Sequence, residues 1–138
     1  MRMLVDTNIV LDVLLDRRPH SIDSLQVFKL VEEGKIAGLL CATTITTIDY
    51  LLTQSLNRTD ARKYLAQLIQ LFDIAPVNRI VFEGAMKSRI VDFADAVLEQ
   101  AALLSGAEAI ITRNAKDFSN GTVKVLDPRQ FLVQIAQQ

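Results

Sequence analysis

Apolar residues occur along this chain in two alternating patterns. Short apolar runs bounded by polar or turn-forming residues predict buried strands, and apolar residues recurring every three or four positions predict amphipathic helices. We expect strands at residues 1–5, 36–42, 72–77, 109–112 and 123–126. We expect helices at residues 9–16, 20–33, 43–56, 59–71, 80–88 and 92–104, and a last helix from about residue 128. The segment between the last two strands is expected to be a polar loop.

Strands that alternate with helices are typical of a parallel sheet covered on both faces, with right-handed crossovers. The 138 residues are 50% hydrophobic and 22% charged, which excludes disorder and allows a sizeable core. The chain shows no internal repeat and no long linker. We therefore expect residues 1–138 to form a single domain of the α/β class, a three-layer α-β-α sandwich with a central parallel sheet.

The charged and reactive residues limit the catalytic mechanisms and binding partners that this chain can have. The 15 Lys and Arg against 16 Asp and Glu give a net charge of −1, so any contact with nucleic acid must be local. The lone Cys41 cannot form an intramolecular disulfide, and the single His20 removes most mechanisms that need an imidazole base. No secretory signal pattern or membrane-spanning apolar run is present, so we expect a cytoplasmic protein without membrane contact. Carboxylates remain as the available chemistry.

Several acidic residues fall where a parallel sheet would bind a ligand, outside the carboxyl ends of its strands. Asp6 directly follows the first predicted strand, and Asp117 lies in the loop after the fourth. Asp92, Asp95 and Glu99 recur at helical spacing and share one helix face. Taken singly, each has a simpler interpretation as a helix cap, a turn residue or part of a solvated face.

Asp49 stands among apolar residues of the helix at 43–56, so it either points to solvent or pairs with a cation. Carboxylates that converge on one pocket repel each other unless something positive lies between them. Mg²⁺ or Mn²⁺ is the usual solution, because these ions prefer oxygen ligands. Such an ion can activate water to attack a phosphodiester, and this chemistry needs neither His nor Cys.

An ordered set of motifs resembles the PIN domain family, close to the VapC-type bacterial ribonucleases. The resemblance extends from residue 4 to about residue 118, nearly the whole chain. The motifs are Leu4-Val5-Asp6-Thr7-Asn8, then Thr44 and Asp49, then Asp92-Phe93-Ala94-Asp95-Ala96, then Ile111-Thr112-Arg113-Asn114, and finally Lys116-Asp117-Phe118.

The resemblance implies a Mg²⁺- or Mn²⁺-dependent endoribonuclease with Asp6, Asp49, Asp95 and Asp117 in its acidic pocket. By that analogy Asp6 and Asp95 are the principal metal ligands, and Asp117 holds a second ion or the attacking water. The family usually has Glu where this chain has the shorter Asp49, so that ligand would reach the ion only through water. The residues implied in supporting contacts are Thr7, Asn8, Asp92 and Asn114.

Many relatives of this kind are toxins of toxin–antitoxin pairs. They cleave tRNA, rRNA or mRNA, are silenced by a small partner protein, and mostly form homodimers. The resemblance therefore implies an RNA substrate, an antitoxin partner and a homodimer. RNA would approach through local positive charge, and Arg17, Arg18, Arg113 and Lys116 are predicted in loops near the strand ends. Surface solubilisation explains these four residues equally well.

Other classes of protein also place acids at strand ends. A phosphatase of the haloacid dehalogenase type would need a second Asp two residues after Asp6, where Asn8 stands. A response-regulator receiver domain would need a phospho-accepting Asp closing the third strand, and none is present. A PIN-like binding or assembly module with weakened catalysis stays open because of Asp49, and metal titration would distinguish it from a nuclease.

Overall fold

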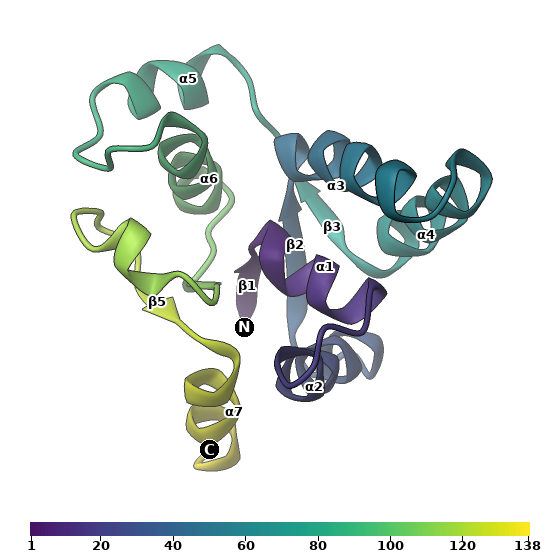
Figure 1. Ribbon diagram of the computed structural model, residues 1–138. Coiled ribbons are helices and arrows are strands. Elements are labelled where there is room, and N and C mark those ends of the chain that lie inside the picture. The colour runs from purple at the N-terminus through teal and green to yellow at the C-terminus, as the bar shows by residue number, and fades with distance from the viewer.

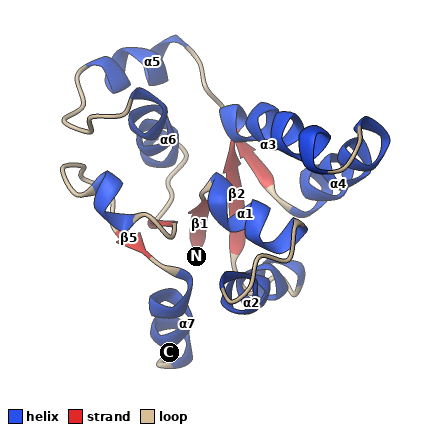
Figure 2. Cartoon of the chain, in the orientation of Figure 1, coloured by secondary structure: helices blue, strands red, loops and turns tan.

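The computed structural model describes residues 1–138 and contains a five-stranded, fully parallel sheet in the order β3-β2-β1-β4-β5. Figures 1 and 2 show the sheet at the centre, with helices on both sides. The predicted α/β class and three-layer architecture are confirmed. The strands are β1 (Arg2–Val5), β2 (Ala37–Cys41), β3 (Asp73–Ala75), β4 (Ala109–Ile111) and β5 (Val125–Leu126).

The helices lie close to their predicted positions. Most begin at a side chain that accepts a hydrogen bond from a backbone N–H of the first turn, as Asp and Asn do at helix starts. They are α1 (Thr7–Leu14), α2 (His20–Glu32), α3 (Ala42–Ser55), α4 (Arg58–Leu71), α5 (Arg79–Met86), α6 (Phe93–Leu104) and α7 (Pro128–Ala136). The predicted polar loop contains a short 3₁₀ helix, η1 (Ala115–Phe118), and the last strand is shorter than predicted.

The core consists of two hydrophobic clusters, one on each face of the sheet, because successive strand side chains point to opposite faces. Met3 and Val5 of β1 join the cluster that includes buried residues of α1 to α4 and α7. Leu4 joins the cluster formed with α5, α6 and η1. In Figure 1, α5 and α6 lie on one side of the sheet and α1, α3 and α4 on the other. No helix is both long and apolar enough to cross a membrane.

The neighbouring strands β1 and β4 position polar residues at the carboxyl edge of the sheet. β1 and β4 are neighbours, with Val5 paired to Ile111, so the residues that follow them, Asp6 and Thr112, emerge side by side. The backbone N–H of Asp6 donates to the carbonyl oxygen of Ile111 at 2.9 Å. The carboxyl edge of the sheet therefore brings together segments about a hundred residues apart in sequence.

Candidate active site

Asp6 is held by hydrogen bonds on both carboxylate oxygens. Oδ1 accepts from the backbone N–H of Thr7 at 2.7 Å, and Oδ2 accepts from the Thr112 hydroxyl at 2.7 Å and from Asn8 Nδ2 at 3.3 Å. The residue is 8% exposed. Burial raises the pKa of Asp6, and the hydrogen bonds from Thr112 and Thr7 oppose that rise. The result is a buried carboxylate with a fixed orientation.

Of the predicted supporting residues, Thr7, Asn8 and Asn114 take part in the hydrogen bonds around Asp6. Asn8 Nδ2 also donates to the Thr112 hydroxyl at 3.3 Å, while Thr7 Oγ1 donates to Thr44 Oγ1 at 3.1 Å. The backbone N–H of Asn114 donates to Thr112 Oγ1 at 3.0 Å. Thr112 is fully buried and was not singled out from the sequence as a site residue. Its place directly after a predicted buried strand was the signal that could have identified it.

The start of α6 brings a second pair of acids to the same edge. Asp92 Oδ1 accepts from the backbone N–H of Asp95 at 3.0 Å, which caps the helix. Burial and, in decreasing order, the negative charges of Asp92, Asp6 and Asp117 together raise the pKa of Asp95 to about 6. Four carboxylates from three separate stretches of chain therefore act on one another electrostatically.

Three of these acids, Asp92, Asp95 and Asp117, line a cavity of about 370 Å³ together with Lys116 and Asn120 among others. Asp117 and Lys116 come from η1, and Asn120 comes from the loop that follows it. Lys116 is the only cation in the lining. The cavity is thus predominantly negative, as expected of a site that binds a metal ion rather than a free phosphate.

The structure does not bring Asp49 to this cluster, contrary to the expectation that it shares the acidic pocket. Its Oδ1 accepts from Arg62 Nε on α4 at 3.1 Å, and its side chain is 28% exposed. Of the two interpretations left open by the sequence, the one with a paired cation is correct. The physical reason is helical geometry, because Thr44 points to the site and Asp49 lies five residues further along α3, roughly 140° around the helix.

Three of the four cations expected to contact RNA are paired with carboxylates. Both Arg113 and Arg17 contact Asp12, which is completely buried; Arg113 does so through Nε and, at 3.2 Å, through Nη2. Arg18 pairs with Asp16 at 3.5 Å. Lys116 remains at the acidic cavity. Asp12 was not predicted as a structural residue from the sequence, although an Asp within the apolar run of α1 signals a buried partner.

Glu99 does not belong to a solvated acidic face. It is 2% exposed, and its Oε2 accepts from the backbone N–H groups of Thr122 at 2.9 Å and Val123 at 3.4 Å. A Cβ on Gly121 would lie 1.8 Å from the same oxygen, so the loop backbone rests directly on this carboxylate. Glu99 therefore fixes the loop that follows η1.

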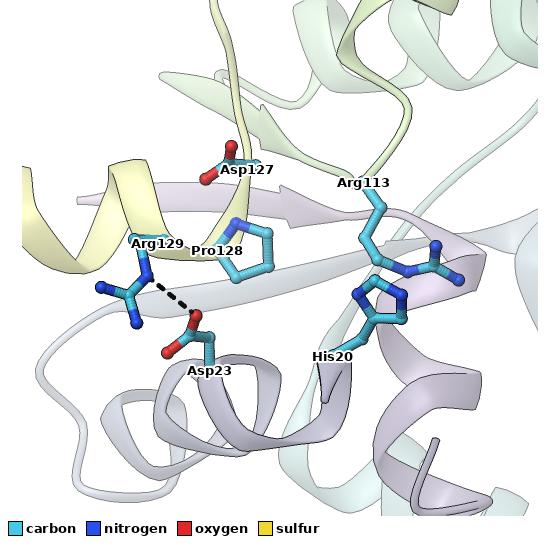
Figure 3. Close-up of a pocket in the computed structure, with 6 residues that line it drawn as sticks. All are labelled: His20, Asp23, Arg113, Asp127, Pro128 and Arg129. Atoms are coloured by element: carbon cyan, nitrogen blue, oxygen red, sulfur yellow. Dashed lines mark ion pairs between the residues drawn. The ribbon is translucent and has the colours of Figure 1, made fainter. Parts of the chain in front are cut away.

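A second hollow, of about 300 Å³, lies between α2 and α7 and is shown in Figure 3. His20 and Arg113 line it, and Arg129 Nε pairs with Asp23 at 3.4 Å. Asp127 caps α7 by accepting from the backbone N–H of Gln130 at 2.7 Å. Most charged residues of this hollow are paired with an opposite charge or cap a helix, so the hollow has no cluster of unpaired acids comparable to the acidic cavity.

The acidic cluster suits a hydrated metal ion better than a fully enclosed one. No three of its side chains are placed to enclose a metal by themselves. Its donors are nevertheless all oxygens, and burial together with their mutual repulsion raises the pKa of Asp95, so a cation would relieve that repulsion. Mg²⁺ commonly binds through one or two carboxylates and keeps several water ligands. The donor set fits such an ion.

The fold and this site define an α/β protein with a carboxylate centre at the carboxyl edge of a parallel sheet. Residues 2–116 match the family model described as PIN domain, and the chain belongs to the PIN domain family. The family resemblance predicted from the sequence motifs is thereby confirmed.

Similar proteins extend over nearly the whole chain. The chain is 23% identical over 135 residues to "Ribonuclease VapC1" of Aquifex aeolicus (strain VF5), covering 94% of this chain and 92% of the relative. It resembles VapBC2 from Rickettsia felis, solved bound to a DNA fragment from its promoter, with a TM-score of 0.73, 13% identity and coverage of 92% and 98% of the two chains. It also resembles Mycobacterium tuberculosis VapC20, a sarcin-ricin loop cleaving toxin, with a TM-score of 0.69, 14% identity and coverage of 89% and 98%.

Proposed function

We propose that this protein is a Mg²⁺- or Mn²⁺-dependent endoribonuclease that hydrolyses RNA phosphodiester bonds. The observation that carries the proposal is the gathering of Asp6, Asp92, Asp95 and Asp117 at one edge of the sheet, where burial and the repulsion of the other three carboxylates raise the pKa of Asp95 to about 6. A protein keeps acids together at this cost chiefly where function requires them. The ribonuclease name of the Aquifex relative supports the same conclusion.

The residues have distinct tasks in this proposal. Asp6 and Asp95 would hold the ion, with Asp6 oriented by Thr7, Asn8 and Thr112. Bound Mg²⁺ or Mn²⁺ would supply an activated water for attack on phosphorus and would stabilise charge on the departing oxygen. Asp117 would orient the attacking water or help to hold a second ion.

We further propose that the protein is the toxin of a type II toxin–antitoxin pair, acting as a homodimer and silenced by an antitoxin. The support comes from relatives of the same fold, which include a protein solved in a VapBC complex and a toxin that cleaves the sarcin-ricin loop. Co-expression with a candidate partner and measurement of the mass of the purified complex would test this part.

The nuclease assignment is tested by incubating the purified protein with a mixed RNA pool in Mn²⁺ or in EDTA. We expect cleavage in Mn²⁺ and none in EDTA. The cleavage rate of Asp95→Asn should fall by more than about 100-fold, because losing a direct metal ligand costs more than losing a residue that hydrogen-bonds to such a ligand. Asp49→Asn is the matched control. It makes the same chemical change outside the cluster and should cleave at close to the wild-type rate.

Full cleavage by Asp95→Asn would contradict the proposed site. A second candidate function, a PIN-fold binding module with weakened catalysis, is favoured by one observation, the lack of three side chains placed to enclose a metal. Absence of Mn²⁺-dependent cleavage in the wild-type protein would support that alternative.

A further inference from the structure

A third hollow, distinct from the one between α2 and α7, adjoins the acidic cavity. It has a volume of about 530 Å³ and lies among the end of α5, α6 and the loop after η1. Lys87, Ser88, Arg89 and Thr122 line it, and no hydrophobic side chain does. Asn120 lines both this hollow and the acidic cavity, so the two are neighbours along one surface.

The two cations of this hollow are free. Lys87 and Arg89 are exposed and form no ion pair, in contrast to Arg17, Arg18 and Arg113, which all contact carboxylates. The hollow thus presents positive charge that the protein itself does not neutralise. Such charge beside a negative centre is what a polyanionic strand requires for binding.

The one acid that lines the hollow is covered. Glu99 is 2% exposed, and its Oε2 accepts from the backbone N–H groups of Thr122 and Val123. The close approach of Gly121 to the same oxygen leaves no room for a side chain between them. Glu99 therefore forms part of the wall of the hollow, while Lys87 and Arg89 are its exposed charged residues.

We propose that Lys87 and Arg89 form a phosphate-binding subsite for single-stranded RNA, next to the acidic centre. This inference rests on the proposed ribonuclease function. The acidic centre repels phosphate until a metal ion is bound, so flanking cations must hold the strand. The strand would run from Lys116 past Asn120 to Arg89, so that a phosphate other than the scissile one lies in the basic hollow.

The test is binding of a fluorescein-labelled single-stranded RNA in EDTA, followed by fluorescence anisotropy over a range of KCl concentrations. The double variant Lys87→Gln/Arg89→Gln should weaken binding by at least about tenfold. It should also reduce the slope of log K against log salt by about 1.4, because each phosphate contact on a single strand contributes about 0.7.

The matched control is Arg58→Gln/Lys63→Gln. It removes the same charge from exposed positions of α4, which packs on the opposite face of the sheet from α5 and α6. The control should keep the wild-type slope. Equal weakening in both double variants, or an unchanged slope in the first, would overturn the proposal. Thermal unfolding of each variant verifies that it is folded.

Binding and cleavage fail separately in this design. If the wild-type protein cleaves RNA and the double variant binds RNA as tightly as the wild type does, the subsite is refuted and the nuclease assignment stands. A protein that does not cleave in Mn²⁺, yet loses binding selectively in the first double variant, would refute the nuclease assignment and leave the subsite standing.

Discussion

Asp6 serves the fold and the candidate site with the same carboxylate. One oxygen caps α1, and the other accepts from Thr112 and Asn8, so the side chain has little freedom to turn away from its acidic neighbours. Hydrogen bonds to the ionised form offset part of the cost of burial. This arrangement keeps a charged oxygen ligand in place before any ion arrives.

The raised pKa of Asp95 predicts how stability changes with pH in the metal-free protein. Between its ordinary value of 3.8 and its value of about 6, the folded state binds a proton that the unfolded state has released. The free energy of unfolding should therefore fall as the pH rises from about 4 to about 6. Because Asp95 is partly exposed, solvent screening limits the loss to about 1 kcal/mol.

Urea denaturation in EDTA at pH 4.5 and pH 7.5 measures this effect. Asp95→Asn should be more stable than the wild type at pH 7.5 and nearly equal to it at pH 4.5. Asp49→Asn, the control, should show no such gain at high pH. If the free energy of unfolding of the wild type, relative to that of Asp95→Asn, increased with pH, folding would stabilise the ionised carboxylate instead.

At the scale of elements, a buried ion pair joins α1 to the segment after β4. Asp12 of α1 is 0% exposed and contacts both Arg113 and Arg17. Removing one member of a buried pair leaves the other desolvated and without its partner. Asp12→Asn should therefore reduce the free energy of unfolding by about 3 kcal/mol, at the lower end of the usual cost because Arg113 is partly exposed.

Equilibrium chemical denaturation tests this prediction, with Asp16→Asn as the control. Asp16 lies on the surface, where it pairs with Arg18 and accepts a hydrogen bond from the Ser21 hydroxyl at 2.8 Å, which the amide oxygen of Asn can also accept, so its replacement should cost clearly less than that of Asp12. Similar stability of the two variants would mean that the Asp12 pair does not tie these elements together.

The element pattern was well predicted where local periodicity decides it. The helices expected from residue 92 and from about residue 128 begin close to those positions, after the caps Asp92 and Asp127, and buried strands follow from apolar runs. The 3₁₀ helix η1 and the shortness of β5 were not predicted, because polar residues carry no periodic signal. Both depend on tertiary contacts, such as the burial of Phe118 and the hydrogen bonds from residues 122 and 123 to Glu99.

For the whole molecule, metal binding should couple to folding. An ion that binds only the folded state stabilises it by RT ln(1 + [M]/Kd), about 2.7 kcal/mol at a hundredfold excess over Kd. We expect Mn²⁺ to raise the melting temperature of the wild type and of Asp49→Asn, but not of Asp95→Asn. No response in any of the three proteins would favour the binding module over the nuclease.

The sequence by itself determined the α/β class, the order of elements and the carboxyl-edge positions of Asp6 and Asp117. These features depend on local burial patterns and on the common direction of parallel strands. Only the tertiary structure decided which charges are satisfied: Asp49 by Arg62, Asp12 by Arg113, and Lys87 and Arg89 by no ion pair within the chain. Ion pairing depends on distances of a few ångströms between segments far apart in the chain, and spacing along one sequence does not contain those distances.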